Sequence, residues 1–310
     1  MAMLFDGRVA IVTGAGQGLG RSHALALAAQ GARVVAADLG ENGNPSPACA
    51  ETVALIQATG GEAVAHGADV VDFAQMEALV ADTLTRWGRV DIVVNNAGIL
   101  RDQSFGKMTP EHFSQVVDVH LKGSFNLSRA AWATLREQGY GRIVMTTSSS
   151  GVFGNFGQAN YAAAKMGLVG LMNTLAIEGE RYGIRVNCIL PIARTAMTEG
   201  LMEAQVLDLF DPGDVSVGVL ALCVDDAPNR LILSAGAGCY SASLTGQTGG
   251  IFLPRAERTP ERLLQRLPDI MSTVGMYSPA SGPEHTFAFA RQSAAAQGID
   301  LSGMSWGPKD

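Results

Sequence analysis

The chain has 310 residues, of which 47% are hydrophobic, and a formal net charge of −7 at pH 7. This is enough apolar material for a substantial core in one large or two modest domains. The negative balance excludes a general nucleic-acid binder, which needs a basic surface. We expect no membrane contact and no signal segment, because no run of about 18 apolar residues occurs. The four cysteines form no CxxC pair and indicate reduced thiols in a cytoplasmic protein.

Strand and helix patterns alternate along the first two thirds of the chain. The stretch RVAIVTGAGQGLG, residues 8–20, is an apolar, β-branched run that breaks into glycines, and an Ala- and Leu-rich stretch follows it. This pattern is typical of a strand, a turn and a helix. Further strands are expected at 32–40, 62–70, 90–98, 141–149 and 184–191, with helices at 73–87, 110–138 and 160–182. Near-continuous apolar strands between helices predict an α/β fold with a doubly wound, Rossmann-like parallel sheet.

The pattern weakens from about residue 195. A short helix is expected within 199–210 and a last strand within 229–238. Farther on, residues 259–271 can form an amphipathic helix, with Thr259 as its cap and Pro260 in its first turn. The sequence therefore predicts one domain at 1–240 and a C-terminal extension at 241–310.

A glycine-rich turn, residues 13–20, lies between the first strand and the first helix. Glycines there allow a tight turn and let a pyrophosphate lie against exposed amides at the positive end of the helix. Asp38 ends the second strand, eighteen residues beyond Gly20. A carboxylate there accepts hydrogen bonds from the ribose hydroxyls of NAD and repels the 2′-phosphate of NADP. The pattern predicts an NAD site, although a strand-end carboxylate in an ordinary turn would look the same.

Tyr161 and Lys165 are four residues apart in NFGQANYAAAKMG, residues 155–167. On a helix this spacing is about one turn, so the phenol and the ammonium project from one face. Alone, such a pair would indicate a solvated helix edge. An ordinary phenol has a pKa of about 10, so it becomes a base at neutral pH only where positive charge favours the phenolate.

Five motifs in chain order together resemble the short-chain dehydrogenase/reductase family: TGAGQGLG at 13–20, NNAG at 95–98, Ser148, YAAAK at 161–165 and VNCILP at 186–191. The resemblance implies that Tyr161 is the acid/base, that Lys165 is its electrostatic partner, and that Ser148 holds the substrate oxygen. It assigns NAD binding and catalysis to 1–240, without a metal, usually in homodimers or homotetramers. The residues that it assigns to the cofactor are Gly14, Gln17, Gly18, Leu19, Gly20, Asp38, Asp69, Val70, Asn96, Ala97, Gly98, Tyr161, Lys165, Pro191 and Thr195.

Two positions depart from the family pattern. The family usually has an Asn in the helix after the fourth strand, where it kinks the helix and binds a proton-relay water, and His120 stands there in this chain. An imidazole with its ordinary pKa of about 6.5 could serve such a relay, which makes His120 a candidate catalytic residue. A packed histidine that holds the helix would fit equally well. Ile192 follows Pro191, where Gly is common.

A narrower resemblance covers residues 95–108, 118–132, 140–168 and 175–184. These are similar to the (3R)-hydroxyacyl-CoA dehydrogenase unit of peroxisomal multifunctional enzymes of type 2, including the His at the usual Asn position. The resemblance implies oxidation of a (3R)-hydroxyacyl-CoA to the 3-ketoacyl-CoA with NAD, on a fatty, branched or steroid side-chain acyl group. Independently of the resemblance, we expect the extension at 241–310 to lid the active site or to contact a subunit.

The candidate substrate pocket is mainly apolar and aromatic, as an acyl chain requires. It consists of Val152, Phe153, Asn155 and Phe156, with Ile99 and Leu100. The candidates for the coenzyme A phosphates, which could equally be ordinary surface charges, are Arg101, Lys107, Arg255 and Arg258.

Two other interpretations stay open. An apolar pocket also suits a hydroxysteroid or a general secondary-alcohol dehydrogenase, which activity on free alcohols would distinguish. A non-catalytic NAD-binding sensor on the same fold would be favoured by loss of the Ser, Tyr or Lys, and all three are present. The nearly apolar helix at 161–178 also predicts a contact with a second subunit, and hence a homodimer.

Overall fold

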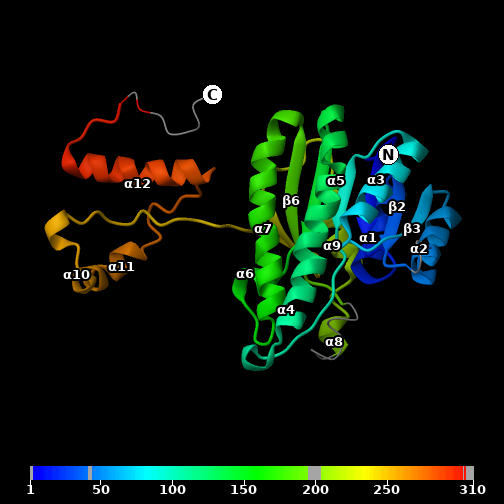
Figure 1. Ribbon diagram of the computed structural model, residues 1–310, viewed down its shortest axis with the longest axis horizontal. Coiled ribbons are helices and arrows are strands. Elements are labelled where there is room, and N and C mark those ends of the chain that lie inside the picture. The colour runs from blue at the N-terminus through cyan, green and yellow to red at the C-terminus, as the bar shows by residue number, and fades with distance from the viewer. Residues whose placement is uncertain (1–2, 41–43, 195–203, 303, 305–310) are drawn as a thin grey trace. The chain divides into compact units, whose positions relative to one another are not determined.

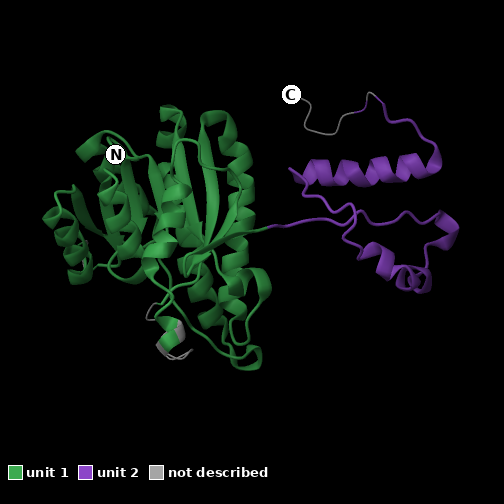
Figure 2. Cartoon of the chain, turned by 180° about the vertical axis from the view of Figure 1, so that it is seen from behind, with its two compact units in different colours: residues 1–243 green, residues 244–310 purple. Residues whose placement is uncertain are grey.

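The computed structural model describes residues 3–40, 44–194, 204–302 and 304. The chain divides into two compact units, Met1–Ser243 and Leu244–Asp310 (Figure 2). The first unit holds an eight-stranded sheet in the order β3-β2-β1-β4-β5-β6-β7-β8 (Figure 1). Its strands are β1 Val9–Thr13, β2 Arg33–Asp38, β3 Ala63–Gly67, β4 Ile92–Asn95, β5 Gly141–Thr146, β6 Ile184–Pro191, β7 Ile232–Gly236 and β8 Cys239–Ser243.

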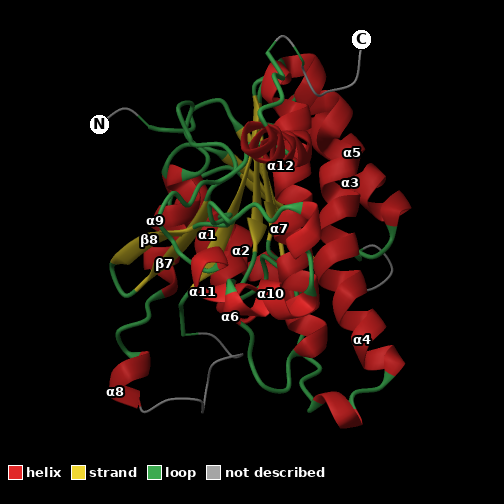
Figure 3. Cartoon of the chain, turned by 90° about the vertical axis from the view of Figure 1, so that its left-hand side faces the viewer, coloured by secondary structure: helices red, strands yellow, loops and turns green. Residues whose placement is uncertain are grey.

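Helices cover both faces of this sheet (Figure 3). Neighbouring strand residues point to opposite faces: Ala10 and Val12 of β1 pack in one apolar cluster and Ile11 packs in the other. Helices α1, α2 and α9 contribute to the first cluster, and α3, α5 and α7 to the second. The helices of this unit are α1 Gly18–Ala29, α2 Pro47–Ala58, α3 Phe73–Trp87, α4 Pro110–Val117, α5 Gly123–Gln138, α6 Ser149–Phe153, α7 Ala159–Gly179, α8 Ala204–Leu207 and α9 Pro212–Ala221.

The predicted doubly wound parallel sheet is confirmed, with two differences in detail. The pairs from β1 to β7 are parallel, but β8 pairs antiparallel with β7. Strand β8 was not expected from the sequence, because its residues, CYSAS, carry no apolar run, and they are mostly exposed in the structure. The helix predicted at 110–138 is α4 and α5 joined by a π-helical turn, Asp118–Lys122. This turn inserts extra backbone into the helix where His120 lies.

Charged and aromatic side chains meet at the amino ends of β1, β4 and β5. Asp91 is fully buried, and its carboxylate pairs with Arg8 at 3.2 Å and with Arg89 at 2.6 Å. The same carboxylate accepts a hydrogen bond from the amide of Val9 at 2.9 Å. The Arg8 guanidinium lies 3.6 Å from the centre of the Tyr140 ring. This group, which we call the amino-end cluster, joins the three strands at one edge of the sheet.

The second unit contains α10 Pro260–Gln265, α11 Leu267–Ile270 and α12 Gly282–Gln297. The helix predicted at 259–271 is therefore divided in two, although Thr259 does cap α10, its hydroxyl accepting from the amide of Arg262 at 3.2 Å. Among its described residues only Ala294 is buried, and large apolar side chains such as Leu264, Met271 and Val274 are exposed. Across the described chain, no helix has the length and apolar character needed to span a membrane.

Candidate active site

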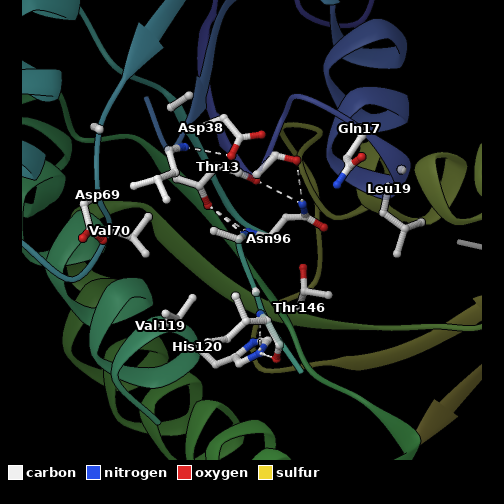
Figure 4. Close-up of a pocket in the computed structure, with 18 of the residues that line it drawn as sticks. Thr13, Gln17, Leu19, Asp38, Asp69, Val70, Asn96, Val119, His120 and Thr146 are labelled. Carbon is white, nitrogen blue, oxygen red and sulfur yellow. Dashed lines mark hydrogen bonds between the residues drawn. The ribbon is translucent and has the colours of Figure 1, made fainter. Parts of the chain in front are cut away.

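A cavity of about 540 Å³ lies at the carboxyl ends of β1 and β4, where the strand order reverses (Figure 4). It brings together most of the residues that the sequence assigned to the cofactor: Gly14, Gln17, Gly18, Leu19, Asp38, Asp69, Val70, Asn96, Ala97, Gly98, Tyr161, Lys165 and Pro191. Gly20 is not on the cavity wall; a Cβ there would stand 2.1 Å from the carbonyl oxygen of Gly14. Thr195 lies outside the described residues.

The glycine turn leaves the start of α1 available to an anion. Gly14 has a φ of 65° and closely approaches Ala97, whose Cα would lie 2.9 Å from an added Cβ. Gln17, the residue before α1, makes no side-chain cap, so the first amides of the helix lack the partner that a cap would supply. An uncapped helix start beside a glycine turn fits the pyrophosphate of a dinucleotide.

Asp38 lies beside the same turn. Its carboxylate accepts hydrogen bonds from the amides of Gly16 and Leu39, both at 2.8 Å. Arg21 holds the turn from the other side, since its guanidinium donates to the carbonyl of Gly16 at 2.7 Å and pairs with Glu51 at 2.7 Å. Asp38 lines the cavity, while the Arg21 guanidinium at the same turn is already paired.

Asn96 fixes the floor of the cavity at the end of β4 (Figure 4). Its side-chain amide donates to the carbonyl of Thr13 at 3.0 Å, and its backbone amide donates to the Thr13 hydroxyl, also at 3.0 Å. The preceding Asn95 is buried and bonds to Ser128 of α5 at 3.0 Å. The side chain of Asn96 therefore connects β4 to β1, and the side chain of Asn95 connects β4 to α5.

Ser148, Tyr161 and Lys165 come from neighbouring segments. Ser148 is the N-cap of α6, and its hydroxyl accepts from the amide of Ser150 at 3.2 Å. Tyr161 and Lys165 lie one turn apart on α7, with the Lys165 Nζ 5.3 Å from the centre of the Tyr161 ring. The Lys165 ammonium also donates to the carbonyl of Thr146 at 2.5 Å. The first turn of α7 and the end of β5 thus converge on one wall of the cavity.

The surroundings change the acidity of both titratable groups. Burial lowers the pKa of Lys165 to about 7. Burial raises the pKa of Tyr161, a hydrogen bond with Ser148 lowers it, and the negative charge of Asp102 raises it. Without a bound ligand, the phenol therefore stays protonated at neutral pH, and it needs positive charge nearby to lose its proton.

His120 is buried beside Tyr161, with the two rings edge to face and their centres 5.1 Å apart. Its Nε2 lies 2.8 Å from the carbonyl oxygen of Ile99, and its Nδ1 is buried without a hydrogen-bond partner. Burial, followed by the charge of Lys165, lowers the pKa of His120 to about 3. The imidazole is therefore neutral near pH 7, which favours the alternative of a packed histidine over a relay with the ordinary pKa of about 6.5. The same Nε2 lies 3.1 Å from the amide nitrogen of Ile99, so it donates to the Ile99 carbonyl in one tautomer and accepts from the Ile99 amide in the other.

The sequence model described as "short chain dehydrogenase" matches residues 8–206. The chain belongs to this family. It is 43% identical over 289 residues to the peroxisomal multifunctional enzyme A of Dictyostelium discoideum, across 92% of this chain and 64% of that protein. It is 43% identical to the hydroxyacyl-CoA dehydrogenase ChsB1 of Mycobacterium tuberculosis, across 68% of this chain and 70% of that protein.

The structure of the full-length peroxisomal multifunctional enzyme type 2 of Drosophila melanogaster superposes with a TM-score of 0.78 at 36% identity, covering 93% of this chain and 49% of that one. The narrower resemblance found in the sequence is thereby confirmed. This short-chain dehydrogenase spans less than two thirds of the multifunctional proteins that it matches.

The predicted substrate residues are not gathered in the cavity of this short-chain dehydrogenase. Phe153 is 75% exposed and Phe156 is 90% exposed, while Asn155 is exposed and Val152 is half-buried. All four lie on α6 or the loop after it, outside the cavity lining. Of the two residues after NNAG, Ile99 lines the cavity and Leu100 does not.

Several cavity residues were missing from the predicted site: Thr13, Ala37, Leu39, Ala68, Met76, Val119 and Thr146. Most of them end a strand or follow one directly. A search of the sequence for all residues at the carboxyl ends of predicted strands would therefore have found them. Val119 and Met76 come from helices and carried no such signal. Among the described residues of this dehydrogenase, no cluster of three or more His, Cys, Asp or Glu could hold a metal.

Proposed function

We propose that this short-chain dehydrogenase oxidises a (3R)-hydroxyacyl-CoA to the 3-ketoacyl-CoA with NAD. The observation that carries the proposal is the meeting of Tyr161, Lys165 and the Ser148 segment beside a dinucleotide-sized cavity. The name of the similar mycobacterial protein, a hydroxyacyl-CoA dehydrogenase, supports the substrate class. A fatty, branched or steroid side-chain acyl group fits this proposal.

Each of the three residues has a distinct task. When bound, the nicotinamide cofactor supplies the hydride acceptor. Tyr161 takes the proton of the substrate hydroxyl at its phenolic oxygen. Ser148 holds the same substrate oxygen by a hydrogen bond, and Lys165 supplies positive charge that favours the phenolate. In this proposal the Ser148 and Tyr161 hydroxyls contact one and the same substrate oxygen.

NAD rather than NADP is the proposed cofactor. The Asp38 carboxylate lines the cavity, where it would repel a 2′-phosphate. Arg21 is engaged by Glu51 and by the Gly16 carbonyl. The position after the carboxylate is Leu39, which cannot pair with a phosphate.

Three further assignments belong to this proposal. We propose that residues 1–240 bind NAD and catalyse, and that the extension from 241 lids the active site or contacts a second subunit of a homodimer. Its exposed apolar side chains support a covering role. A cytoplasmic location is proposed from the unpaired cysteines at 49, 188, 223 and 239. Light scattering tests the dimer, and fluorescence imaging of the tagged protein distinguishes the cytoplasm from peroxisomes.

Initial rates of NADH formation test the reaction. The purified protein is given NAD or NADP with (3R)-hydroxyacyl-CoAs, with the (3S) isomers, and with steroid and simple secondary alcohols, beside Tyr161→Phe as the blank. Tyrosine-dependent turnover of the (3R) thioesters with NAD supports the proposal. Turnover of free alcohols alone would instead assign a hydroxysteroid or general alcohol dehydrogenase, and no turnover of any substrate would refute the dehydrogenase activity proposed here.

A further inference from the structure

The side chain of Gln158 joins three segments around the start of α7. Its Oε1 accepts from the Ser150 hydroxyl at 2.7 Å and from the Asn155 amide at 3.0 Å. Its Nε2 donates to the Asp102 carboxylate at 2.6 Å, a short, charge-assisted hydrogen bond. Gln158 is the N-cap residue of α7, yet its side chain caps nothing there. Its bonds therefore hold neighbouring segments and not the end of its own helix.

Two more bonds run beside this one, in antiparallel order. The amide of Gln103 donates to the carbonyl of Gly157 at 2.8 Å. The side chain of Asn160, which is fully buried, donates to the carbonyl of Arg101 at 3.0 Å. Residues 101–103 and 157–160 thus form a clasp of three consecutive links, and Gln158–Asp102 is its central, charged link.

The clasp holds the elements that carry the reacting hydroxyls. Ser150, bonded to Gln158, lies in α6, whose N-cap is Ser148. Tyr161 directly follows the clasp in the first turn of α7. Gln158 is thus hydrogen-bonded into both segments and also to the loop that follows β4.

We propose that Gln158, fixed by Asp102, is a positioning residue that sets the Ser148 hydroxyl against the Tyr161 hydroxyl. The inference rests on the proposed function, because it assumes that these two hydroxyls share one substrate oxygen. A displacement of about 1 Å between reacting groups can lower a rate by about 100-fold, so a clasp of this kind affects kcat without touching the substrate.

The groups around Tyr161 set the pKa of its phenol, so a change in the position of Gln158 or Asp102 can be measured as a change in that pKa. Lys165 faces the phenol from α7, His120 from the π-helical turn, Ser148 from α6 and Asp102 from the loop after β4. His120 is neutral above a pH of about 3 because burial lowers its pKa. Asp102 is therefore the anion of this set, and Gln158 fixes its distance from the phenol.

The test exchanges donor and acceptor across the central link. Gln158→Glu keeps the shape but turns the donor that faces Asp102 into a second negative oxygen. We expect kcat to fall about 10- to 100-fold, the apparent KM for NAD to stay unchanged, and the acidic limb of the pH profile, on which the rate rises as Tyr161 loses its proton, to move to higher pH. The double variant Gln158→Glu with Asp102→Asn restores one donor and one acceptor in reverse order, and we expect it to recover most of the lost kcat.

Gln138→Glu is the matched control. Gln138 is also half-buried, and its Nε2 donates to the carbonyl of Val90 at the amino end of β4. This variant loses a comparable hydrogen bond far from the clasp, so its stability falls while kcat and the pH profile stay as in the wild type. If Gln158→Glu does not fold, Asp102→Ala removes the same link from the exposed side and is expected to lower kcat in the same way.

Ultraviolet difference titration of the Tyr161 phenol, with Tyr161→Phe as the blank, separates this inference from the proposed function. A higher phenol pKa in Gln158→Glu that returns towards the wild-type value in the double variant supports the clasp even if no substrate is turned over. A Gln158→Glu protein with wild-type kcat and phenol pKa overturns it. A double variant as impaired as the single one does so too.

Discussion

Lys165 gives the sharpest quantitative prediction, because the residue is 3% exposed and burial lowers the pKa of its amine from 10.5 to about 7. Between these two values the unfolded chain holds a proton that the folded chain has lost, so stability rises with pH across that window. One pKa unit corresponds to about 1.4 kcal/mol, so the buried amine lowers the free energy of unfolding at pH 7 by about 4 kcal/mol.

Lys165→Met removes this penalty and loses the hydrogen bond to the carbonyl of Thr146, which costs about 1–3 kcal/mol. We expect the variant to be more stable than the wild type at pH 7 by about 1–3 kcal/mol. By pH 10 the wild type has regained most of the free energy of unfolding that the buried amine costs it at pH 7. The variant should then no longer be the more stable protein. Urea unfolding of the ligand-free proteins at both pH values measures the difference. A variant that is less stable at pH 7, or a difference that does not change with pH, would refute the reasoning.

Three further predictions concern the cavity. Gly98→Ala places a Cβ 2.2 Å from the Cε1 of His120, so we expect a loss of about 1–3 kcal/mol in thermal unfolding and a lower kcat; an unchanged melting temperature would contradict the packing described. Asp38→Ala should raise the NADP-to-NAD ratio of kcat/KM about tenfold or more, because the repelling carboxylate is gone; an unaltered ratio would remove Asp38 from the specificity argument. The pH profile of His120→Asn should keep every inflection of the wild type above pH 5, because the imidazole protonates only near its lowered pKa of about 3; an inflection lost from the variant would show that His120 titrates there.

Most of the residues that the sequence assigned to the cofactor line one cavity, because many of them end strands or follow them. Parallel strands put their carboxyl ends at one edge, so Gly14, Asp38 and Asn96 had to approach one another once the strands were identified. The substrate side follows no such rule. Phe153 and Phe156 are close to Ser148 in sequence, but they lie on a short helix and a loop whose direction no periodicity fixes, and both are exposed.

Properties that depend on the surroundings were likewise out of reach. His120 was given the pKa of a free imidazole, whereas the π-helical turn and the neighbouring Ile99 bury it. The link between Asp102 and Gln158 joins residues 56 positions apart through side chains. Neither the residue types nor their spacing in the sequence predicts such a hydrogen bond, because it depends on how two loops fold towards each other.

The amino-end cluster bears on how such a chain can change under selection. Its charged and stacked pairs join the strands at the edge of the sheet opposite the cavity. Loops at the carboxyl edge can therefore lengthen, shorten or exchange residues while the contacts of the amino-end cluster still hold the sheet together. We therefore expect changes in the segments after β4 and β5 to alter the substrate at little cost in stability, whereas substitutions around Asp91 should lower stability whatever the substrate.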